Sequence, residues 1–198
     1  RSPDPALRQS VFSALCAWAR PGVLRLSVRP GRKLTGVFTG PALGPVRDWT
    51  QTLELNFVAS EFPYWQEDSP EERTAQGQTA DLAFVPAGST EYSFLEAEIF
   101  SPADAVLTSV ILETWVAGSR LSRVYFPGLS LTGGEAFSMT YTDSLSLLLR
   151  AGSRDAAPFR TRASSDDLIL IPARTNTVLL VLDQPCVIRL RARGIYSQ

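Results

Sequence analysis

Residues 94–126 decide the fold of this chain, reading FLEAEIF, SPADA, VLTSVILETWV, AGS and RLSRVYF in succession. In the first run, Leu95, Ala97 and Ile99 occupy every second position, which is the period of a β-strand with one buried face. The other two apolar runs are rich in β-branched and aromatic residues and are separated by Gly118-Ser119. This stretch therefore predicts three strands, over residues 94–100, 106–116 and 120–126.

Further runs of the same kind follow toward the C-terminus, separated by glycine- or proline-containing dipeptides such as Pro127-Gly128, Gly133-Gly134 and Gln184-Pro185. The runs cover residues 136–141, 144–150, 167–171, 177–182 and 186–193. No helical period lies among them. Eight short strands at such spacing predict an antiparallel β-sandwich or jelly roll.

The N-terminal segment has a different pattern, because Leu7, Val11, Leu15 and Trp18 recur at helical spacing. Asp4 is a good N-cap and the following proline suits the first helical position. The sequence therefore predicts one amphipathic helix that lies on a sheet and ends at Pro21-Gly22.

Strand signals follow this helix. Residues 23–28 and 34–38 flank the turn Pro30-Gly31, and the dipeptides Gly40-Pro41 and Gly44-Pro45 predict a loop. After that loop the sequence alternates cleanly over residues 49–57. One face of this expected strand holds Trp49, Gln51, Leu53, Leu55 and Phe57.

A polar stretch, EDSPEERTAQGQ, starts at Glu67 and is the sharpest change of composition in the chain. Such a stretch is typical of a boundary between domains. We therefore predict a helix-bearing β domain at 1–66, a polar linker at 67–80 and a β-sandwich domain at 81–198.

The composition restricts the chemistry, because the 198 residues include no histidine. Nucleophilic relays that use histidine are excluded. The two cysteines, Cys16 and Cys186, do not have the spacing of a metal site, and we interpret them as buried thiols, a disulfide between them remaining open. We expect no catalytic residues, no cofactor and no metal.

The charge and hydropathy patterns exclude two classes of partner. Lys+Arg number 19 against 20 for Asp+Glu, which speaks against a nucleic-acid binder. No stretch reaches the roughly 18 to 20 apolar residues that span a bilayer, so membrane insertion is not expected.

Two sets of side chains deserve weighing as sites. Glu96 and Glu98 lie on one face of a predicted strand, where a solvated strand face explains them better than a catalytic carboxylate pair does. Tyr64, Trp65, Tyr92 and Tyr125 are candidate aromatic contacts for a partner protein or a glycan. Burial in the core or between domains is the interpretation that we favour for most of these rings.

Three segments of the sequence resemble the distal tail protein family of long-tailed, non-contractile bacteriophages. The first runs from Gly31 to Gly36, the second is the strand 53–57 followed by Phe62-Pro63-Tyr64-Trp65, and the third spans 164–178 together with the last strand and Arg191 to Tyr196. Phe62 stands where the family usually has an acidic residue, and Ala173 where it usually has glycine.

The resemblance implies a mostly β chain with an N-terminal belt-type β domain carrying one helix, followed by a galectin-like or jelly-roll antiparallel sandwich. The family's belt has strands before its helix, whereas here the helix begins at Asp4. Either upstream strands are lacking from this sequence or the belt is a reduced one.

The resemblance also implies a function: a structural virion component without catalytic residues. Its partners would be further copies of itself in a ring, by family resemblance a hexamer, the tail tube protein, tail tip proteins and a receptor-binding protein. The protein would sit at the tail tip after assembly in the bacterial cytoplasm.

The distribution of charge is compatible with self-assembly. Basic residues crowd the first third of the chain and acidic residues crowd the middle, so head-to-tail copies would bring opposite charges together. An uneven surface without that role is the competing interpretation. The sets are Arg1, Arg8, Arg20, Arg25, Arg29 and Arg32 against Glu61, Glu67, Asp68, Glu71 and Glu72.

Two alternatives belong to other functional classes. A carbohydrate-binding sandwich would use exposed aromatic rings of the second domain for adhesion to host glycan. A hydrolase would have to work with carboxylates alone.

Overall fold

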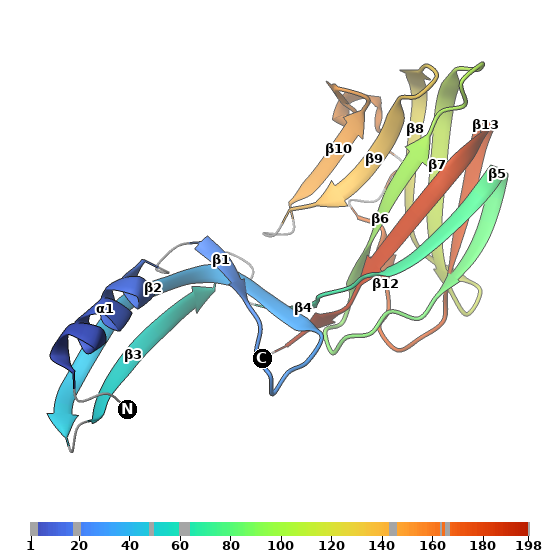
Figure 1. Cartoon of the computed structure of the whole chain (residues 1–198). Helices are drawn as coiled ribbons and strands as arrows, with labels where there is room; N and C mark the ends of the chain where they lie inside the picture. The colour runs from blue at the N-terminus through green and yellow to red at the C-terminus, as the bar shows by residue number, and fades with distance from the viewer. Residues whose placement is uncertain are drawn as a thin grey trace. The chain divides into compact units, whose positions relative to one another are not determined.

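The computed structural model describes residues 4–17, 21–47, 50–59, 64–142, 146–162, 164 and 167–197. The chain divides into two units, Arg1–Pro63 and Tyr64–Gln198, whose elements Figure 1 labels. Antiparallel strands dominate both units, and the described residues contain a single α-helix. The predicted fold class, mostly β with one helix, is confirmed.

Unit 1 contains the helix α1 (Pro5–Cys16) and the strands β1 (Pro21–Leu24), β2 (Arg32–Arg47) and β3 (Thr50–Ala59). The Ala6 N–H donates to Asp4 Oδ1 at 2.9 Å, so Asp4 caps the helix as predicted. Strand β2 pairs with β1 on one side and β3 on the other. The Phe38 and Phe57 rings meet edge to face across β2 and β3, with centroids 4.9 Å apart.

The loop predicted at the two Gly-Pro dipeptides is wrong, because β2 runs through both of them. The register with β3 shifts between Thr39 and Ala42 and again between Leu43 and Val46. Proline cannot donate to the ladder, so a strand containing it needs a bulge at that point. The dipeptides therefore mark irregularities within one long strand.

Unit 2 is a sandwich whose strands order as β11-β10-β9-β6-β13-β7-β8, with β5 added to β13 and β12 to β6. Strand β4 pairs with β14, with Trp65 opposite Tyr196. A short 3-10 helix, η1 (Ala157–Phe159), follows β11. The strands are β4 (Trp65–Glu67), β5 (Glu71–Phe84), β6 (Ser93–Phe100), β7 (Leu107–Val116), β8 (Ser119–Leu131), β9 (Ala136–Tyr141), β10 (Leu147–Ala151), β11 (Arg154–Asp155), β12 (Ile169–Leu170), β13 (Asn176–Arg193) and β14 (Ile195–Tyr196).

The long strands β5 and β13 pass through both layers of this sandwich. Residues 177–182 of β13 pair with β7, and residues 187–193 pair with β6. The side chains between the layers are fully buried and form one core cluster. Examples are Leu112 from β7, Phe126 from β8, Ile99 from β6 and Leu190 from β13.

The strands predicted at 177–182 and 186–193 are therefore two halves of β13, with Gln184-Pro185 at the bend. The register of β13 with β5 shifts between Val181 and Cys186. The Asp183 carboxylate fastens this bend to the start of β7, accepting the Thr108 hydroxyl at 2.6 Å and the Ser109 N–H at 3.0 Å. A bulge held by a side chain explains why turn-forming residues occur inside a strand.

The prediction of a polar linker at 67–80 is also corrected, because most of these residues belong to β5. Within the described residues β5 pairs only with β13, so it is an edge strand. Its half-buried side chains include Ala75 and Leu82, while most of its charged residues face water. Charged side chains and glycine keep an edge strand from pairing with another chain. The same residue types are common in linkers, so the sequence of this strand resembles one.

The C-terminal motif that carried the family resemblance builds a specific turn. Asn176 is fully buried, and its amide accepts the Ile171 N–H at 2.9 Å and donates to the Ile171 and Arg174 carbonyls. Ala173 in this turn has a φ of 55°. Glycine adopts that conformation without steric cost, whereas an alanine is strained by it.

Candidate functional site

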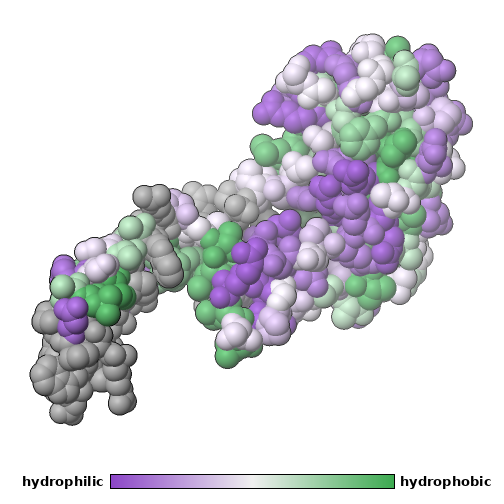
Figure 2. Space-filling model, in the orientation of Figure 1, coloured by the Kyte–Doolittle hydropathy of each residue, from purple (hydrophilic) through white to green (hydrophobic). Residues whose placement is uncertain are grey.

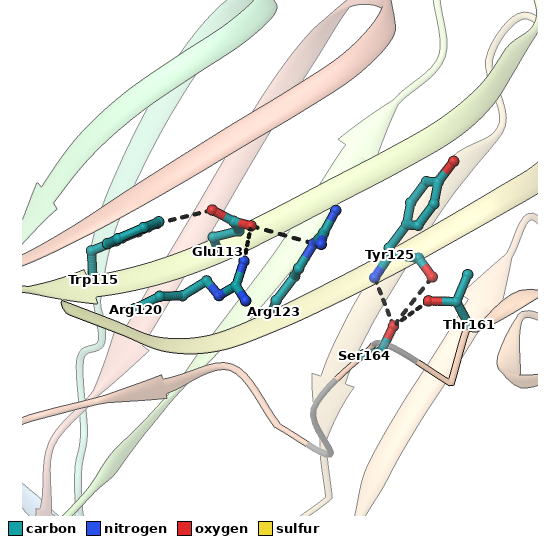
Figure 3. A network of polar contacts seen from close by, with 7 residues as sticks. All are labelled: Glu113, Trp115, Arg120, Arg123, Tyr125, Thr161 and Ser164. Carbon is teal, nitrogen blue, oxygen red and sulfur yellow. Dashed lines mark hydrogen bonds and ion pairs between the residues drawn. The ribbon is translucent and has the colours of Figure 1, made fainter.

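A polar cluster that includes aromatic and arginine side chains centres on Glu113 in β7, shown in Figure 3. One carboxylate oxygen accepts the Trp115 indole N–H at 3.0 Å. The other lies 3.1 Å from Arg120 Nη1 and 3.3 Å from Arg123 Nε. Two guanidinium groups and an indole are thus held by one side chain.

Strand geometry explains why these residues meet. Glu113 pairs with Arg123 and Trp115 pairs with Arg120 across β7 and β8. Residues two apart on a strand share a face, and paired residues lie side by side. Because Leu112 and Thr114 point into the core, the cluster lies on the outer face of the sheet.

Tyr125 continues this face along β8. The Arg123 guanidinium carbon lies 5.8 Å from the centre of the Tyr125 ring, a cation–π distance. Figure 3 also shows how its backbone is fixed, since the Tyr125 N–H donates to Ser164 Oγ at 2.8 Å. We call Glu113, Trp115, Arg120, Arg123 and Tyr125 the aromatic–arginine face.

Glu113 is buried, with 9% of its surface exposed, whereas the side chain of Arg120 is 47% exposed. Burying a carboxylate costs several kcal/mol unless charged hydrogen bonds offset the loss of water. Here hydrogen bonds from Trp115 and Arg120, together with the ion pair to Arg123, supply that compensation. The arrangement fixes Trp115, Arg120 and Arg123 in a rigid group at the surface, carrying two positive charges and one negative charge.

The four aromatic residues predicted as contacts do not all lie together. Tyr125 is on β8, whereas Trp65 pairs with Tyr196 of β14, next to Tyr64. Tyr92 lies just after Ser89, whose N–H donates to the Ile195 carbonyl of β14. The Tyr92 carbonyl accepts the Thr90 hydroxyl. Three of the candidates are thus near the β4–β14 pair and the fourth is elsewhere.

Their exposure also differs. Tyr64 is 37% and Tyr92 42% exposed, so both can contact a ligand. Hydrogen bonding and charge from Glu91 raise the pKa of Tyr92. Trp65 is only 6% exposed, which agrees with the burial weighed against a contact role for these rings.

The Glu96 and Glu98 carboxylates are engaged by neighbouring strands. Glu98 Oε2 lies 3.2 Å from Arg189 Nη1 and 3.5 Å from Arg191 Nη2. Glu96 Oε1 accepts the Tyr141 N–H at 3.2 Å. Figure 2 shows this part of β5, β6 and β13 as a hydrophilic surface. These contacts agree with the sequence-based interpretation of Glu96 and Glu98 as part of a solvated strand face rather than a catalytic pair.

The acidic residues predicted to meet a neighbouring copy also bond within unit 2. Glu72 Oε2 lies 2.8 Å from Arg191 Nε, and Glu67 Oε2 accepts the Gly194 N–H at 3.1 Å. Glu71 pairs with Arg73. Arg1, Arg20 and Glu61 lie outside the described residues. Glu71 and Glu72 are therefore paired with arginines inside the unit, and Glu67 is bonded there to a backbone N–H.

Cys186 is a free, buried thiol, as interpreted from the sequence. Desolvation by burial and the charge of Asp183 raise its pKa to about 11, so it is unreactive at neutral pH. Among the described residues there is no group of three or more cysteines and carboxylates that could hold a metal ion. The helix that the structure describes is too short to cross a membrane.

Sequence reasoning placed Trp115 and Tyr125 on strands but did not assemble the aromatic–arginine face. The missing information was the β7–β8 register, which brings Arg120 and Arg123 to Glu113. One signal in the sequence could have predicted the aromatic–arginine face. Glu113 and Trp115 alternate on one strand, and Arg120 and Arg123 follow on the next strand after a two-residue turn.

Searches with protein-family models and against curated proteins give no match. Among solved structures, the chain is similar to the crystal structure of the Dit protein of phage SPP1, with a TM-score of 0.64. The match covers 98% of this chain and 74% of that one, at 13% sequence identity. That protein is described as a paradigm of the hub adsorption apparatus in phages that infect Gram-positive bacteria. Both units of this chain therefore share the fold of a phage tail hub protein, which confirms at the level of the fold the resemblance inferred from sequence.

Proposed function

We propose that this protein is a structural, non-enzymatic subunit of the distal end of a phage tail. Copies of it form a ring, a hexamer by family resemblance, which joins the tail tube to tip and receptor-binding proteins. The protein resides in the virion after assembly in the bacterial cytoplasm. The observation that carries this proposal is the fold shared with the SPP1 hub protein along 98% of the chain.

Unit 1 supplies the surface for self-association. Among its residues whose burial the structure describes, only Leu34 and Gly36 are buried. Apolar side chains are instead open to water, and Figure 2 shows hydrophobic surface over α1. They are Leu7 (50% exposed), Val11 (51%), Val23 (43%), Val28 (82%) and Val58 (55%). Obligate interfaces resemble a core divided between subunits, and this unit has that character.

The aromatic–arginine face of unit 2 supplies the surface for a tip or receptor-binding protein. Tryptophan, tyrosine and arginine are the residues that contribute most to binding at protein interfaces. On this face the Glu113 carboxylate holds Trp115 and both arginines in place. Fixed side chains lose less conformational entropy when a partner binds.

Self-association is tested by introducing charge on α1 with Leu7→Glu and Val11→Glu. Glutamate is a good helix former, so the helix persists while its apolar surface is lost. We expect sedimentation velocity to show a ring-sized species for the natural chain and a monomer for the double variant. The matched control is Val187→Glu, which replaces a 49% exposed valine on β13 of unit 2. A double variant that assembles like the control would contradict the role of unit 1.

The docking face is tested by co-purification with the tip proteins of the same phage. Trp115→Ala combined with Arg120→Ala should weaken that binding at least tenfold. Tyr64→Ala, at the β4–β14 pair, is the control and should leave it unchanged. Equal binding by both variants would remove the aromatic–arginine face from the proposal.

A further inference from the structure

Unit 2 has a small open pocket between β6, β9, β13 and the β4–β14 pair, away from the aromatic–arginine face. Its lining includes Gln66, Phe94, Glu96, Tyr141, Thr142 and Arg193. The cavity volume is about 30 Å³, room for about two water molecules. Because the pocket is open to solvent, a small substituent of a larger ligand can enter it while the rest of the ligand stays outside.

Polar groups of opposite charge are fixed in this pocket. Arg193 Nη1 donates to Gln66 Oε1 at 3.2 Å, and Gln66 itself is only 6% exposed. The Glu96 carboxylate is fixed by the Tyr141 N–H, 3.2 Å from its Oε1. One pocket thus presents a guanidinium, which donates hydrogen bonds, and a carboxylate, which accepts them.

Aromatic rings complete the lining. The Phe94 and Tyr141 rings lie 5.1 Å apart at an interplanar angle of 41°. The Tyr141 hydroxyl donates to Asp167 Oδ1 at 3.2 Å, which turns the polar end of this ring toward Asp167. Burial raises the pKa of Tyr141 well above its ordinary value, so the phenol stays neutral. The rings therefore offer an apolar wall beside the charged groups.

These three features together define the group that fits. A free carboxylate would be repelled by Glu96, and a free ammonium group by Arg193. A secondary amide with a methyl group satisfies all of them: its N–H donates to Glu96, its carbonyl accepts from Arg193, and its methyl contacts the rings.

We propose that this pocket binds the N-acetyl group of an amino sugar. The choice of a sugar over a protein amide rests on the proposed tail-tip function, because the outer surface of a bacterium presents sugar polymers to a tail tip. The sugar ring stays at the mouth of the pocket, since the cavity accommodates only the acetyl part.

The test uses the full chain and saturation-transfer NMR with N,N′-diacetylchitobiose, with cellobiose and chitobiose as matched disaccharides that lack the acetyl group. We expect the acetyl methyl protons to receive the strongest saturation. Titration should show at least tenfold weaker binding for cellobiose and chitobiose. Equal binding of the three disaccharides, or binding of none, would overturn the proposal.

Paired variants on β6 locate the site. Glu96→Gln should weaken diacetylchitobiose binding about tenfold, while Glu98→Gln, two residues along the same face, should leave it unchanged. Thermal melting establishes that both variants are folded. Equal losses in both variants would overturn the assignment, as would equally tight binding of N-acetylasparagine amide, which would make a protein amide the ligand. Sedimentation reports ring formation independently, so failure of sugar binding leaves the proposed tail function standing.

Discussion

At the scale of single residues, Asp183 shows how one carboxylate holds a bend in the longest strand. Desolvation raises its pKa, but hydrogen bonds from the Thr108 hydroxyl and from the Ser109 and Thr108 N–H groups outweigh that effect and hold its pKa below the ordinary value. Its contribution to stability is therefore present above the unfolded-state pKa of about 3.9 and is lost as the pH falls through the folded value.

Asp183→Asn should lower the free energy of unfolding by about 1 kcal/mol at pH 7, because hydrogen bonds to a charged acceptor are replaced by weaker ones. The difference between variant and natural chain should shrink as the pH falls from about 3.9, the unfolded-state value, through the lower folded-state value. Urea unfolding at pH 7 and across that acidic range measures it. Asp104→Asn, at an exposed turn position, is the control and should change little. A difference independent of pH would contradict the role of the Asp183 charge.

Glu113 is expected to stabilise unit 2 as well as to organise its surface. A double-mutant cycle of Glu113→Gln and Arg120→Gln should give a coupling energy of about 1 kcal/mol, because the carboxylate is buried. The comparison cycle uses Glu71 and Arg73, an ion pair on the edge strand β5, with an expected coupling below about 0.5 kcal/mol. Chemical denaturation measures both. Equal couplings would mean that the burial of Glu113 adds nothing.

At the scale of elements, two turns contain an alanine in the left-handed region. They are Ala117, with a φ of 48° between β7 and β8, and Ala173, with a φ of 55° before β13. The conformation costs about 1–2 kcal/mol for an L-residue, and replacing the alanine with glycine removes this strain. Glycine also increases the conformational entropy of the unfolded chain, which offsets about 0.4–1 kcal/mol of the gain.

Ala117→Gly and Ala173→Gly should therefore each raise the free energy of unfolding by about 0.5 kcal/mol. The control, Ala80→Gly in the middle of β5, should lower it by about 0.5–1 kcal/mol, since glycine weakens a regular strand. Urea midpoints distinguish the two directions. If all three variants are destabilised alike, the turn geometry has no energetic consequence.

The sequence predicted elements well where apolar alternation was strong. Residues 94–100 and 136–141 coincide with β6 and β9 within a residue. It failed where turn-forming residues served another purpose: Gly40-Pro41 lies in a bulged strand, Gln184-Pro185 in a bend held by Asp183, and Gly77 on an edge strand. In each case tertiary pairing overrode local preference, which a single sequence does not reveal.

The sites were harder to predict for the same reason. The pocket that joins Gln66, Glu96 and Arg193 draws on strands separated by up to 127 positions. Its residues look like ordinary polar positions of a strand until the register is known. Tyr64 and Trp65 are neighbours in sequence, but Tyr64 is exposed and Trp65 is buried, a difference that their residue types do not reveal.

At the scale of the whole molecule, the two units have contrasting surfaces. Unit 2 buries a continuous core between its layers, with side chains such as Phe84 and Phe137 fully covered. Unit 1 leaves Leu7, Val11 and Val28 open to water. A chain with one self-sufficient unit and one apolar, open unit is suited to an assembly in which neighbouring copies cover the second kind of surface.

We propose that copies of this chain close into a ring that meets the tail tube. The most direct measurement is electron microscopy of the purified chain mixed with the tail tube protein of the same phage. We predict closed rings of uniform diameter, seated at the ends of tubes, and their loss in the Leu7→Glu, Val11→Glu double variant. Monomers that neither close into rings nor bind the tube, at concentrations where the tube itself is intact, would contradict the account.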